Sequence, residues 1–333
     1  MNATQRPYRG DVDLSAILAL KQLCITPQNV YDRPTTSDLR QLFTPFIELT
    51  AGVNENSSWQ EALQGMPSED RYRALTQRFT ALWEDANSRL VAFALIAQPG
   101  CSLTFQVHPQ AQGQGVEAGI LAWGLVQAQL IVQTRGTPRD LWCRCHEGEQ
   151  KRRGVLEAAG FLPLFERDLR LVHELAQPVS PVSLPAGFAL KKGVKQREFD
   201  AYQGLHQAVF DGTSMAMDYH ESGAYQPELD LIAVGPTGQF EAFCLCKIKQ
   251  VTDSQGERLV GEVGVIGTRP ELQRQGLGQA LLLTGLRLLQ ARGATSAYLE
   301  TSESHLSAQR LFASVGFTHL SSWQWYAKTV EPF

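Results

Sequence analysis

The clearest pattern of apolar and polar positions lies in the second half of the chain, over residues 262–283. The apolar run at 263–268 predicts a strand, and Pro270 predicts the turn that ends it. A polar segment with two glycines follows, and from Gln279 onward apolar residues recur at helical spacing. The pattern therefore predicts a strand, a short glycine-containing loop and the first turns of a helix.

Similar patterns predict alternating strands and helices along the whole chain. In the second half they predict strands over residues 188–191, 229–234, 240–249 and 296–301, and helices over 196–210 and 306–315. In the first half they predict strands over 89–98 and 103–109, and helices over 14–20, 72–82 and 117–130. Both halves thus have the mixed composition of an α/β (α+β) fold.

The first half repeats the organisation of the second. Residues 109–115 (PQAQGQG) align with residues 270–276 (PELQRQG), and the Gly-Phe pair at 160–161 aligns with the pair at 316–317. The repeat has a period of about 150–160 residues, which is large enough for each copy to be a domain. A chain of 333 residues also fits two domains of roughly 150 residues each.

A proline-rich segment separates the two copies. Residues 176–187 (AQPVSPVSLPAG) contain three prolines and show no amphipathic period. Because proline restricts its own backbone and that of the preceding residue, we predict an extended linker here. The predicted domains are then residues 1–175 and residues 188–333.

Composition and charge narrow the class of protein. Apolar residues make up 43% of the chain and charged residues 19%, as in ordinary globular proteins. The formal net charge is -4, so no overall basic field favours nucleic acid or an anionic membrane as a partner. No apolar run approaches the roughly 18 residues of a membrane helix, and no signal peptide is recognised. We expect a cytoplasmic protein, monomeric or homodimeric.

The six cysteines do not have the spacing of a metal site. Cys143 and Cys145, like Cys244 and Cys246, form C-x-C pairs in strand-like runs, where both sulfurs point to one face. We interpret them as small buried residues and predict no metal; a metal-binding or redox pair is the alternative.

The loop at residues 273–278 (QRQGLG) carries the candidate chemistry. Its glycines allow a tight turn with inward-pointing amides, and the helix that begins there adds the positive end of its dipole. Together these features form a socket for phosphate groups. The alternative is a strand–turn–helix connection with a glycine cap and no ligand; the position between a strand and a helix favours phosphate.

Three motifs of the second half resemble the GNAT superfamily of acyl-CoA-dependent N-acyltransferases. They are the strand VGVIGT (263–268), the QxxGxG loop (273–278) and the AxxLF…GF segment (308–317). The duplication resembles the tandem members of the superfamily, in which two domains are fused. The resemblance implies a mixed, mostly antiparallel central sheet flanked by helices in each domain. It also implies acetyl-CoA as cosubstrate and a primary amine of a small molecule as acceptor.

The resemblance further implies which residues bind acetyl-CoA. The loop amides would hold the pyrophosphate, and the backbone at the end of the preceding strand would pair with pantetheine and orient the acetyl carbonyl. The residues implicated are Ile266, Gly267, Thr268, Gln273, Arg274, Gln275, Gly276, Leu277, Gly278, Gln279, His305 and Ala308. His305 replaces the usual asparagine of the family, and a plain surface or cap histidine is the alternative.

Transfer to an amine requires a general base, and Glu262 is the candidate. It begins the predicted strand, at a position where similar enzymes often carry a base or a water-holding glutamate. We expect burial beside Val263 and Val265 to raise its pKa. An exposed strand-end glutamate or an ion-pair partner is the alternative, and Glu300 on the following strand is the second candidate.

One departure from the superfamily concerns the acid. The usual tyrosine, which protonates the leaving thiolate, is replaced by Phe312. Ser302, Ser304, Tyr298 or His305 could donate instead. The thiolate could also leave without an acid, because a model thiol has a pKa near 8.5.

The first half departs further from the motifs. Glu117 stands where the second loop glycine is expected, and Arg152 and Leu156 stand at the alanine and tyrosine positions of the downstream motif. A carboxylate in the loop would repel a pyrophosphate, so we predict that this half has lost acetyl-CoA binding. The departures leave a second interpretation of the chain, as a non-catalytic acyl-CoA-binding or sensing protein.

Overall fold

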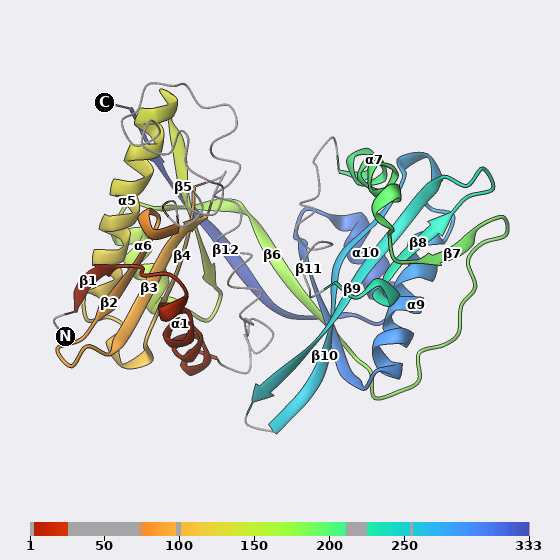
Figure 1. The fold of residues 1–333 in the computed structure, drawn as a ribbon, viewed down its shortest axis with the longest axis horizontal. Helices are drawn as coiled ribbons and strands as arrows, with labels where there is room; N and C mark the ends of the chain where they lie inside the picture. The colour runs from red at the N-terminus through yellow and green to blue at the C-terminus, as the bar shows by residue number, and fades with distance from the viewer. Residues whose placement is uncertain are drawn as a thin grey trace. The chain divides into compact units, whose positions relative to one another are not determined.

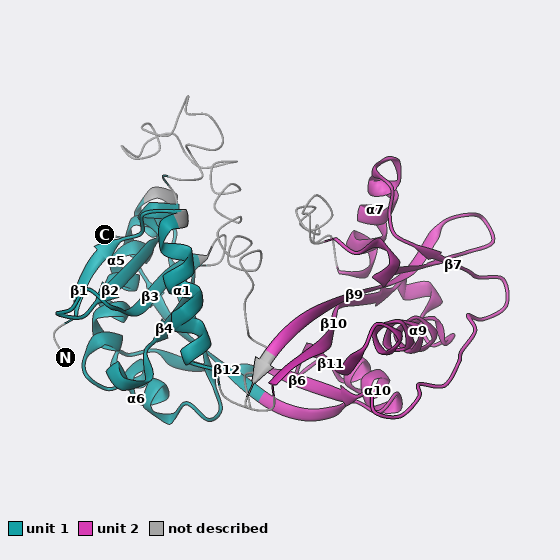
Figure 2. Cartoon of the chain, turned by 60° about the horizontal axis from the view of Figure 1, so that its bottom comes forward, with its two compact units in different colours: residues 1–167, 322–333 teal, residues 168–321 magenta. Residues whose placement is uncertain are grey.

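The computed structural model describes residues 3–25, 74, 76–97, 101–210, 225–253 and 256–332. The chain forms two compact units, with Met1–Arg167 and Ser322–Phe333 in unit 1 and Asp168–Ser321 in unit 2 (Figure 2). Each unit is a mostly antiparallel sheet flanked by helices, so the predicted fold class is confirmed.

The elements of unit 1 are β1 (Thr4–Pro7), α1 (Asp11–Leu23), β2 (Thr80–Glu84), β3 (Leu90–Ala97), β4 (Ser102–Val107), α5 (Val116–Arg135), β5 (Arg139–His146), α6 (Gln150–Ala158) and the end of β12 (Thr318–Val330). Strands β1 to β4 pair antiparallel, β5 pairs parallel with β4, and β12 pairs antiparallel with β5. The helix predicted over residues 72–82 is wrong at its end, because β2 begins at Thr80. Four consecutive buried residues of β2 carry no alternation from which a strand could be recognised.

Helix α5 is the core helix of unit 1. By length and composition it could span a membrane, since residues 116–133 have a mean hydropathy of 1.3, and the prediction that no such run exists is wrong. Half of that stretch is buried within the protein. Gly124 lies so close to β4 that an added Cβ would be 2.9 Å from Leu103 Cδ2. The apolar residues of α5 therefore pack in the core of the unit, and the helix runs beside the strands of the sheet in Figure 1.

The elements of unit 2 are the end of β6 (Leu162–Glu174), β7 (Ala189–Lys192), α7 (Phe199–Val209), β8 (Asp230–Val234), β9 (Phe240–Asp253), β10 (Gly256–Thr268), α9 (Leu277–Ala291), β11 (Ala294–Ser302), α10 (Leu306–Ser314) and the start of β12. Strands β7 to β10 pair antiparallel, and β11 pairs parallel with β10. Helices α9 and α10 cover one face of this sheet and α7 covers the other (Figure 2).

Each sheet is completed by a strand from the other half of the sequence. In unit 1, residues 323–330 of β12 pair with β5; in unit 2, residues 168–174 of β6 pair with β11. The chain thus passes between the units within β6 and again within β12, and not at the predicted boundary near residue 175. Local periodicity shows that a segment is a strand, but not which distant strand it pairs with.

The predicted linker, residues 176–187, lies within unit 2. It has no helix or strand, and Val179 and Leu184 pack against the core of the unit. Gln290 on α9 fixes its beginning, because its side chain accepts a hydrogen bond from Val179 N at 3.2 Å and donates to Leu175 O at 2.7 Å. The prolines therefore give an extended strap along unit 2.

The cysteines are packing residues. All six are buried and none forms a disulfide, and burial raises the pKa of the Cys145 thiol to about 11. Cys244 Sγ and Cys246 Sγ lie 3.8 Å apart beneath α9, where a Cβ added to Gly285 would be 2.8 Å from Cys246 Sγ. In the described ranges no group of three His, Cys, Asp or Glu residues could hold a metal ion.

Candidate active site

Strands β10 and β11 separate directly after Glu262. They pair in parallel from Leu259 to Glu262, and Glu262 lies opposite Tyr298 in the last pair. Strand β10 stays paired with β9 as far as Thr268, with a bulge at Gly264. The backbone of residues 263–268 is therefore hydrogen-bonded to a strand on one side only, which leaves its other edge for an extended ligand.

The predicted phosphate loop follows this open edge. After a short 3-10 turn (Pro270–Leu272), Arg274 and Gly276 have left-handed backbones with φ values of 64° and 87°. The side chain of Gln273 donates to Thr268 O at 3.3 Å and ties the loop to the strand. In the described chain, the amides of residues 274–279 donate to no backbone carbonyl. They form the N-terminal end of α9, where the helix dipole favours an anion.

Small residues keep the surroundings of the open edge free. A Cβ on Gly267 would lie 2.5 Å from Val209 Cγ1 on α7, so glycine is required for β10 to pass beneath that helix. A Cβ on Gly278 would meet Leu311 and Thr268 only at 3.4 and 3.6 Å. Ala308 on α10 is half-buried against the core. Of the remaining predicted residues, Ile266 is half-buried, Leu277 is buried, and Gln275 and Gln279 are exposed.

Glu262 is an ion-paired residue at the point of separation. Its Oε2 accepts a 2.5 Å hydrogen bond from the Tyr298 hydroxyl and lies 3.2 Å from Lys249 Nζ. Burial alone would raise its pKa, but the positive charge of Lys249 and the hydrogen bond from Tyr298 outweigh it and hold the pKa below the usual 4.5. The predicted raised pKa is therefore wrong, because it considered only the apolar neighbours along the strand.

Two cations, Lys249 and Arg170, lie beside the ring of Tyr298, and both were missed from the sequence. The Arg170 guanidinium lies 5.3 Å from the centre of the Tyr298 ring, and Lys249 Nζ lies 4.9 Å from it. Arg170 also forms an ion pair with Glu300. The carboxylate of the second candidate base is therefore paired with a cation. The KIK alternation at residues 247–249 could have indicated lysines on one face of β9. Arg170 gave no such signal, since β6 belongs to the other half of the sequence.

Phe312 and the side chains that the sequence suggested as alternative acids lie in different surroundings. Phe312 is buried in the core against Phe317, with ring centres 6.0 Å apart, so the usual tyrosine position holds no donor. The hydroxyls of Ser302 and Ser304 lie 2.9 Å from one another. His305 is exposed at the first turn of α10, and its side chain makes no capping hydrogen bond.

The corresponding loop of unit 1 has the same backbone. Gly113 and Gly115 have φ values of 73° and 91°, as Arg274 and Gly276 have in unit 2. Glu117, however, is buried in unit 1, and its Oε1 accepts a 2.9 Å hydrogen bond from Gly113 N. A carboxylate of the chain thus takes the amide that a phosphate would use.

Arg152 lies in the corresponding groove. Its Nη1 donates to Phe105 O at 3.2 Å, and its guanidinium lies 3.8 Å from the centre of the Phe105 ring. Phe105 aligns with Ile266, and Arg152 with Ala308, so a long cation replaces a methyl group beside the open strand edge. The strand position of unit 1 that aligns with Ile266 is therefore covered by Arg152.

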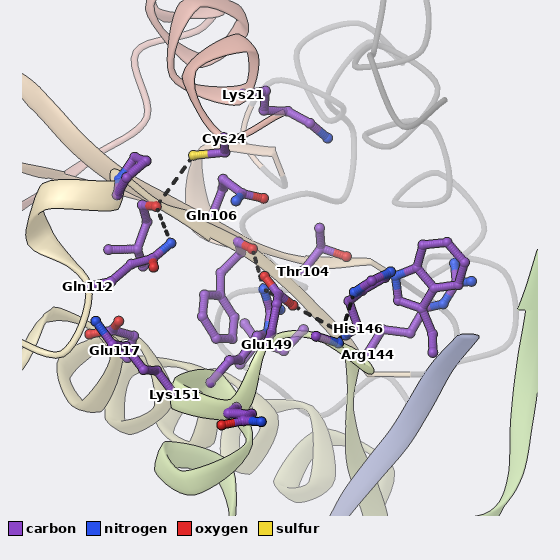
Figure 3. Close-up of a pocket in the computed structure, with 18 of the residues that line it drawn as sticks. Lys21, Cys24, Thr104, Gln106, Gln112, Glu117, Arg144, His146, Glu149 and Lys151 are labelled. Carbon is purple, nitrogen blue, oxygen red and sulfur yellow. Dashed lines mark hydrogen bonds and ion pairs between the residues drawn. The ribbon is translucent and has the colours of Figure 1, made fainter. Parts of the chain in front are cut away.

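A cavity of about 1060 Å³ remains in unit 1 where β4 and β5 separate. Gln112 and Glu117 line one side of it, and Arg144 and His146 line the other (Figure 3). The Arg144 guanidinium lies 4.6 Å from the ring centre of Trp323 on β12. Charged and polar side chains line the cavity, and Gly113 N and Phe105 O beside it are already bonded to Glu117 and Arg152.

We expect one acetyl-CoA per chain in isothermal titration calorimetry of the wild-type protein. The double variant Glu117→Gly/Arg152→Ala should bind a second, weaker equivalent, because it frees Gly113 N and the Phe105 edge. The control Glu147→Gly/Arg153→Ala, which changes a neighbouring pair of the same residue types, should still bind one. Two equal sites in the wild-type chain would contradict the prediction.

The separated strands followed by a phosphate loop at a helix N-terminus define an acyl-CoA-dependent acyltransferase. Comparison with known proteins agrees with this class. The Acetyltransferase (GNAT) family matches residues 200–317, which lie in unit 2. The chain belongs to the GNAT acetyltransferase family, in its tandem form, and acetyl-CoA is its cosubstrate.

Among its relatives are mycothiol acetyltransferases. The enzyme of Thermobispora bispora is 30% identical over 227 residues, which are 64% of this chain and 70% of the relative. That of Pseudarthrobacter chlorophenolicus is 27% identical over 306 residues, which are 87% and 91% of the two chains.

Solved structures share the fold. The GCN5-related N-acetyltransferase of Sphaerobacter thermophilus has a TM-score of 0.67 and 17% identity, and the match covers 99% of this chain and 96% of that one. A tandem GNAT protein from the clavulanic acid biosynthesis pathway has a TM-score of 0.63 and 13% identity over the full length of both chains.

Proposed function

We propose that this chain transfers the acetyl group of acetyl-CoA directly to a primary amine of a small molecule within a ternary complex. The observation that carries the proposal is the separation of β10 and β11 at Glu262. It joins three requirements at one place: an unpaired strand edge, free loop amides, and a carboxylate where the edge begins.

Acetyl-CoA would bind along that edge. The amides of residues 274–279 hold the pyrophosphate, and the backbone of residues 266–268 pairs with the pantetheine arm. A backbone amide at this edge then stabilises the oxyanion of the tetrahedral intermediate. Gly278 and Ala308 leave the space that Glu117 and Arg152 fill in unit 1.

The lowered pKa of Glu262 determines when the proton moves. A carboxylate ionised at neutral pH is a weak base toward a free ammonium ion, whose pKa lies several units higher. The acceptor therefore attacks as the neutral amine. Its nitrogen becomes acidic as the C–N bond forms, and Glu262 then takes the proton. The C–S bond breaks and coenzyme A leaves as a thiolate, which solvent protonates, since Phe312 supplies no proton.

The relatives suggest the first acceptors to examine. Several are named mycothiol acetyltransferases, so mycothiol without its acetyl group belongs in the set. Other cysteinyl thiols with a free amine, amino acids, polyamines and aminoglycosides complete it. We propose that the acceptor is one of these small amines and that unit 2 alone carries the reaction.

A screen for coenzyme A release tests the proposal. Amine-dependent release of one thiol per acetylated product, identified by mass spectrometry, is the expected result. The second candidate function is an acyl-CoA sensor, which the missing acid and the closed site of unit 1 favour. Tight acetyl-CoA binding without release for any amine of the set would support the sensor and contradict the enzyme.

A further inference from the structure

Glu262 uses one of its two carboxylate oxygens to bind neighbouring side chains. Tyr298 and Lys249 both contact Oε2. The other oxygen, Oε1, would lie 3.9 Å from a Cβ added to Gly264. Gly264 is the bulge residue, beyond which β10 has no partner on the β11 side. Oε1 therefore faces the beginning of the opening.

We propose that Tyr298 and Lys249 are positioning residues, which hold Glu262 by Oε2 so that Oε1 receives the proton of the acceptor amine. The inference rests on the proposed function. The amine nitrogen forms a bond to the thioester carbon, the C–S bond breaks with its electron pair on sulfur, and the N–H proton moves to Oε1. Neither positioning residue touches the reacting atoms.

The ring of Tyr298 is itself held in place. Its side chain is 4% exposed, and both Lys249 and Arg170 lie within cation–π distance of the ring. Arg170 is buried and paired with Glu300 on the same strand as Tyr298. These contacts hold the ring so that its hydroxyl points toward Glu262. Because Arg170 lies on β6, the alignment of the base depends on a strand from the first half of the sequence.

The hydroxyl proton of Tyr298 is donated to Glu262, so Tyr298 acts through the carboxylate and not on the departing thiolate. This separates it from the role that a tyrosine at the position of Phe312 would have. It also gives Lys249 and Tyr298 a common effect, because each favours the ionised form of Glu262. Their removal should raise its pKa, since burial then dominates.

Among the residues that the structure describes, the charged and titratable groups around Glu262 lie on β9, β10, β11, β6 and α7. On the same face or packed against it are Lys247 and Lys249 on β9, Arg258 on β10, Tyr298 and Glu300 on β11, Arg170 on β6 and His206 on α7. Lys249 and Tyr298 make the direct contacts with the carboxylate, so their substitution is the selective test.

The experiment compares the wild-type chain with Tyr298→Phe and Lys249→Met. Two quantities are measured: the pH dependence of kcat with the best amine, and the ionisation of Glu262 in the ligand-free protein by carbon-13 NMR of labelled glutamate. The Glu262 signal is identified by its loss in Glu262→Gln. Both variants should lower kcat about tenfold, shift its acidic limb to higher pH and raise the pKa of Glu262. The KM for acetyl-CoA should stay within about twofold, because neither residue lies at the loop.

Tyr326→Phe is the matched control, because its hydroxyl also donates to a carboxylate, Glu157, but in unit 1. It should change neither quantity. An unchanged kcat profile and an unchanged Glu262 signal in Tyr298→Phe and Lys249→Met would overturn the positioning role. If the NMR signal shifts as expected while the wild-type protein acetylates no amine, the proposed function fails and the alignment of Glu262 stands.

Discussion

Replacing Glu262 with glutamine is expected to lower kcat about 100-fold or more, the range over which a positioned general base accelerates proton transfer. Glutamine keeps the shape of the side chain but cannot take a proton. The Kd for acetyl-CoA should change little, because the residues that we propose to contact the cofactor, 266–279 with His305 and Ala308, do not include Glu262. Steady-state kinetics together with calorimetric binding of acetyl-CoA separate the two effects.

The pH dependence of the wild-type enzyme supplies a second check. Since the pKa of Glu262 lies below 4.5, the carboxylate is ionised throughout the neutral range. The ratio kcat/KM should therefore rise with pH until the acceptor amine itself is deprotonated. A plateau that begins near pH 6, whatever the amine, would indicate a base with a raised pKa and would contradict this assignment.

Glu198→Gln is the matched control. Glu198 lies in the same unit, is paired with Lys191 at 3.0 Å, and has a side chain 23% exposed, against 26% for Glu262. It should leave kcat unchanged. Thermal unfolding of both variants guards against a folding defect. The lowered pKa also means that ionised Glu262 stabilises the fold above its unfolded pKa, and that this contribution is lost as the pH falls through the folded pKa.

The phosphate loop could be predicted from sequence because every part of it is local. The strand, Pro270, the polar turn and Gly276 follow one another, and the left-handed φ of 87° at Gly276 is one that glycine adopts readily. The substitution in the corresponding loop of unit 1 is equally local, since Glu117 stands in the motif itself. What the motif could not show was that Glu117 binds Gly113 N and closes the loop from within.

The lowered pKa of Glu262 could not be predicted from the residues beside it in the sequence, because the side chains that lower it lie on other strands. Val263 and Val265 are its neighbours in sequence, and they suggested a raised pKa. Lys249 on β9 and Tyr298 on β11 are its neighbours in space, and they lower it. Both contacts depend on strand register, which the pattern of each strand alone does not fix.

The assignment of strands to the two units could not be predicted from the sequence for the same reason. The duplication predicted one copy in each half of the sequence, whereas the ends of β6 and β12 lie in the unit formed mainly by the other half. Each of these strands is long, 13 residues, and carries residues for both units. Arg170 therefore belongs to the candidate site of unit 2, and Trp323 to the cavity of unit 1.

Truncation of the chain after Ser321 should unfold unit 1. The missing residues supply the strand that pairs with β5, and Trp323, Tyr326 and Val330 are each at most 7% exposed. Burial of one large apolar side chain contributes about 1.5–3 kcal/mol, so the loss of three approaches the total stability of a domain, about 5–15 kcal/mol. It also leaves β5 as an unpaired edge.

Hydrogen exchange followed by mass spectrometry measures the effect. Peptides from β5 should lose protection in the truncated chain, while peptides from β8 and β9, whose partners all lie in unit 2, should keep it. The control ends at Val330 and retains the whole of β12, so its β5 peptides should remain protected. Protected β5 peptides in the chain that ends at Ser321 would show that unit 1 folds without residues 323–330 of β12. In that case the linear division of the sequence would also describe how the chain folds.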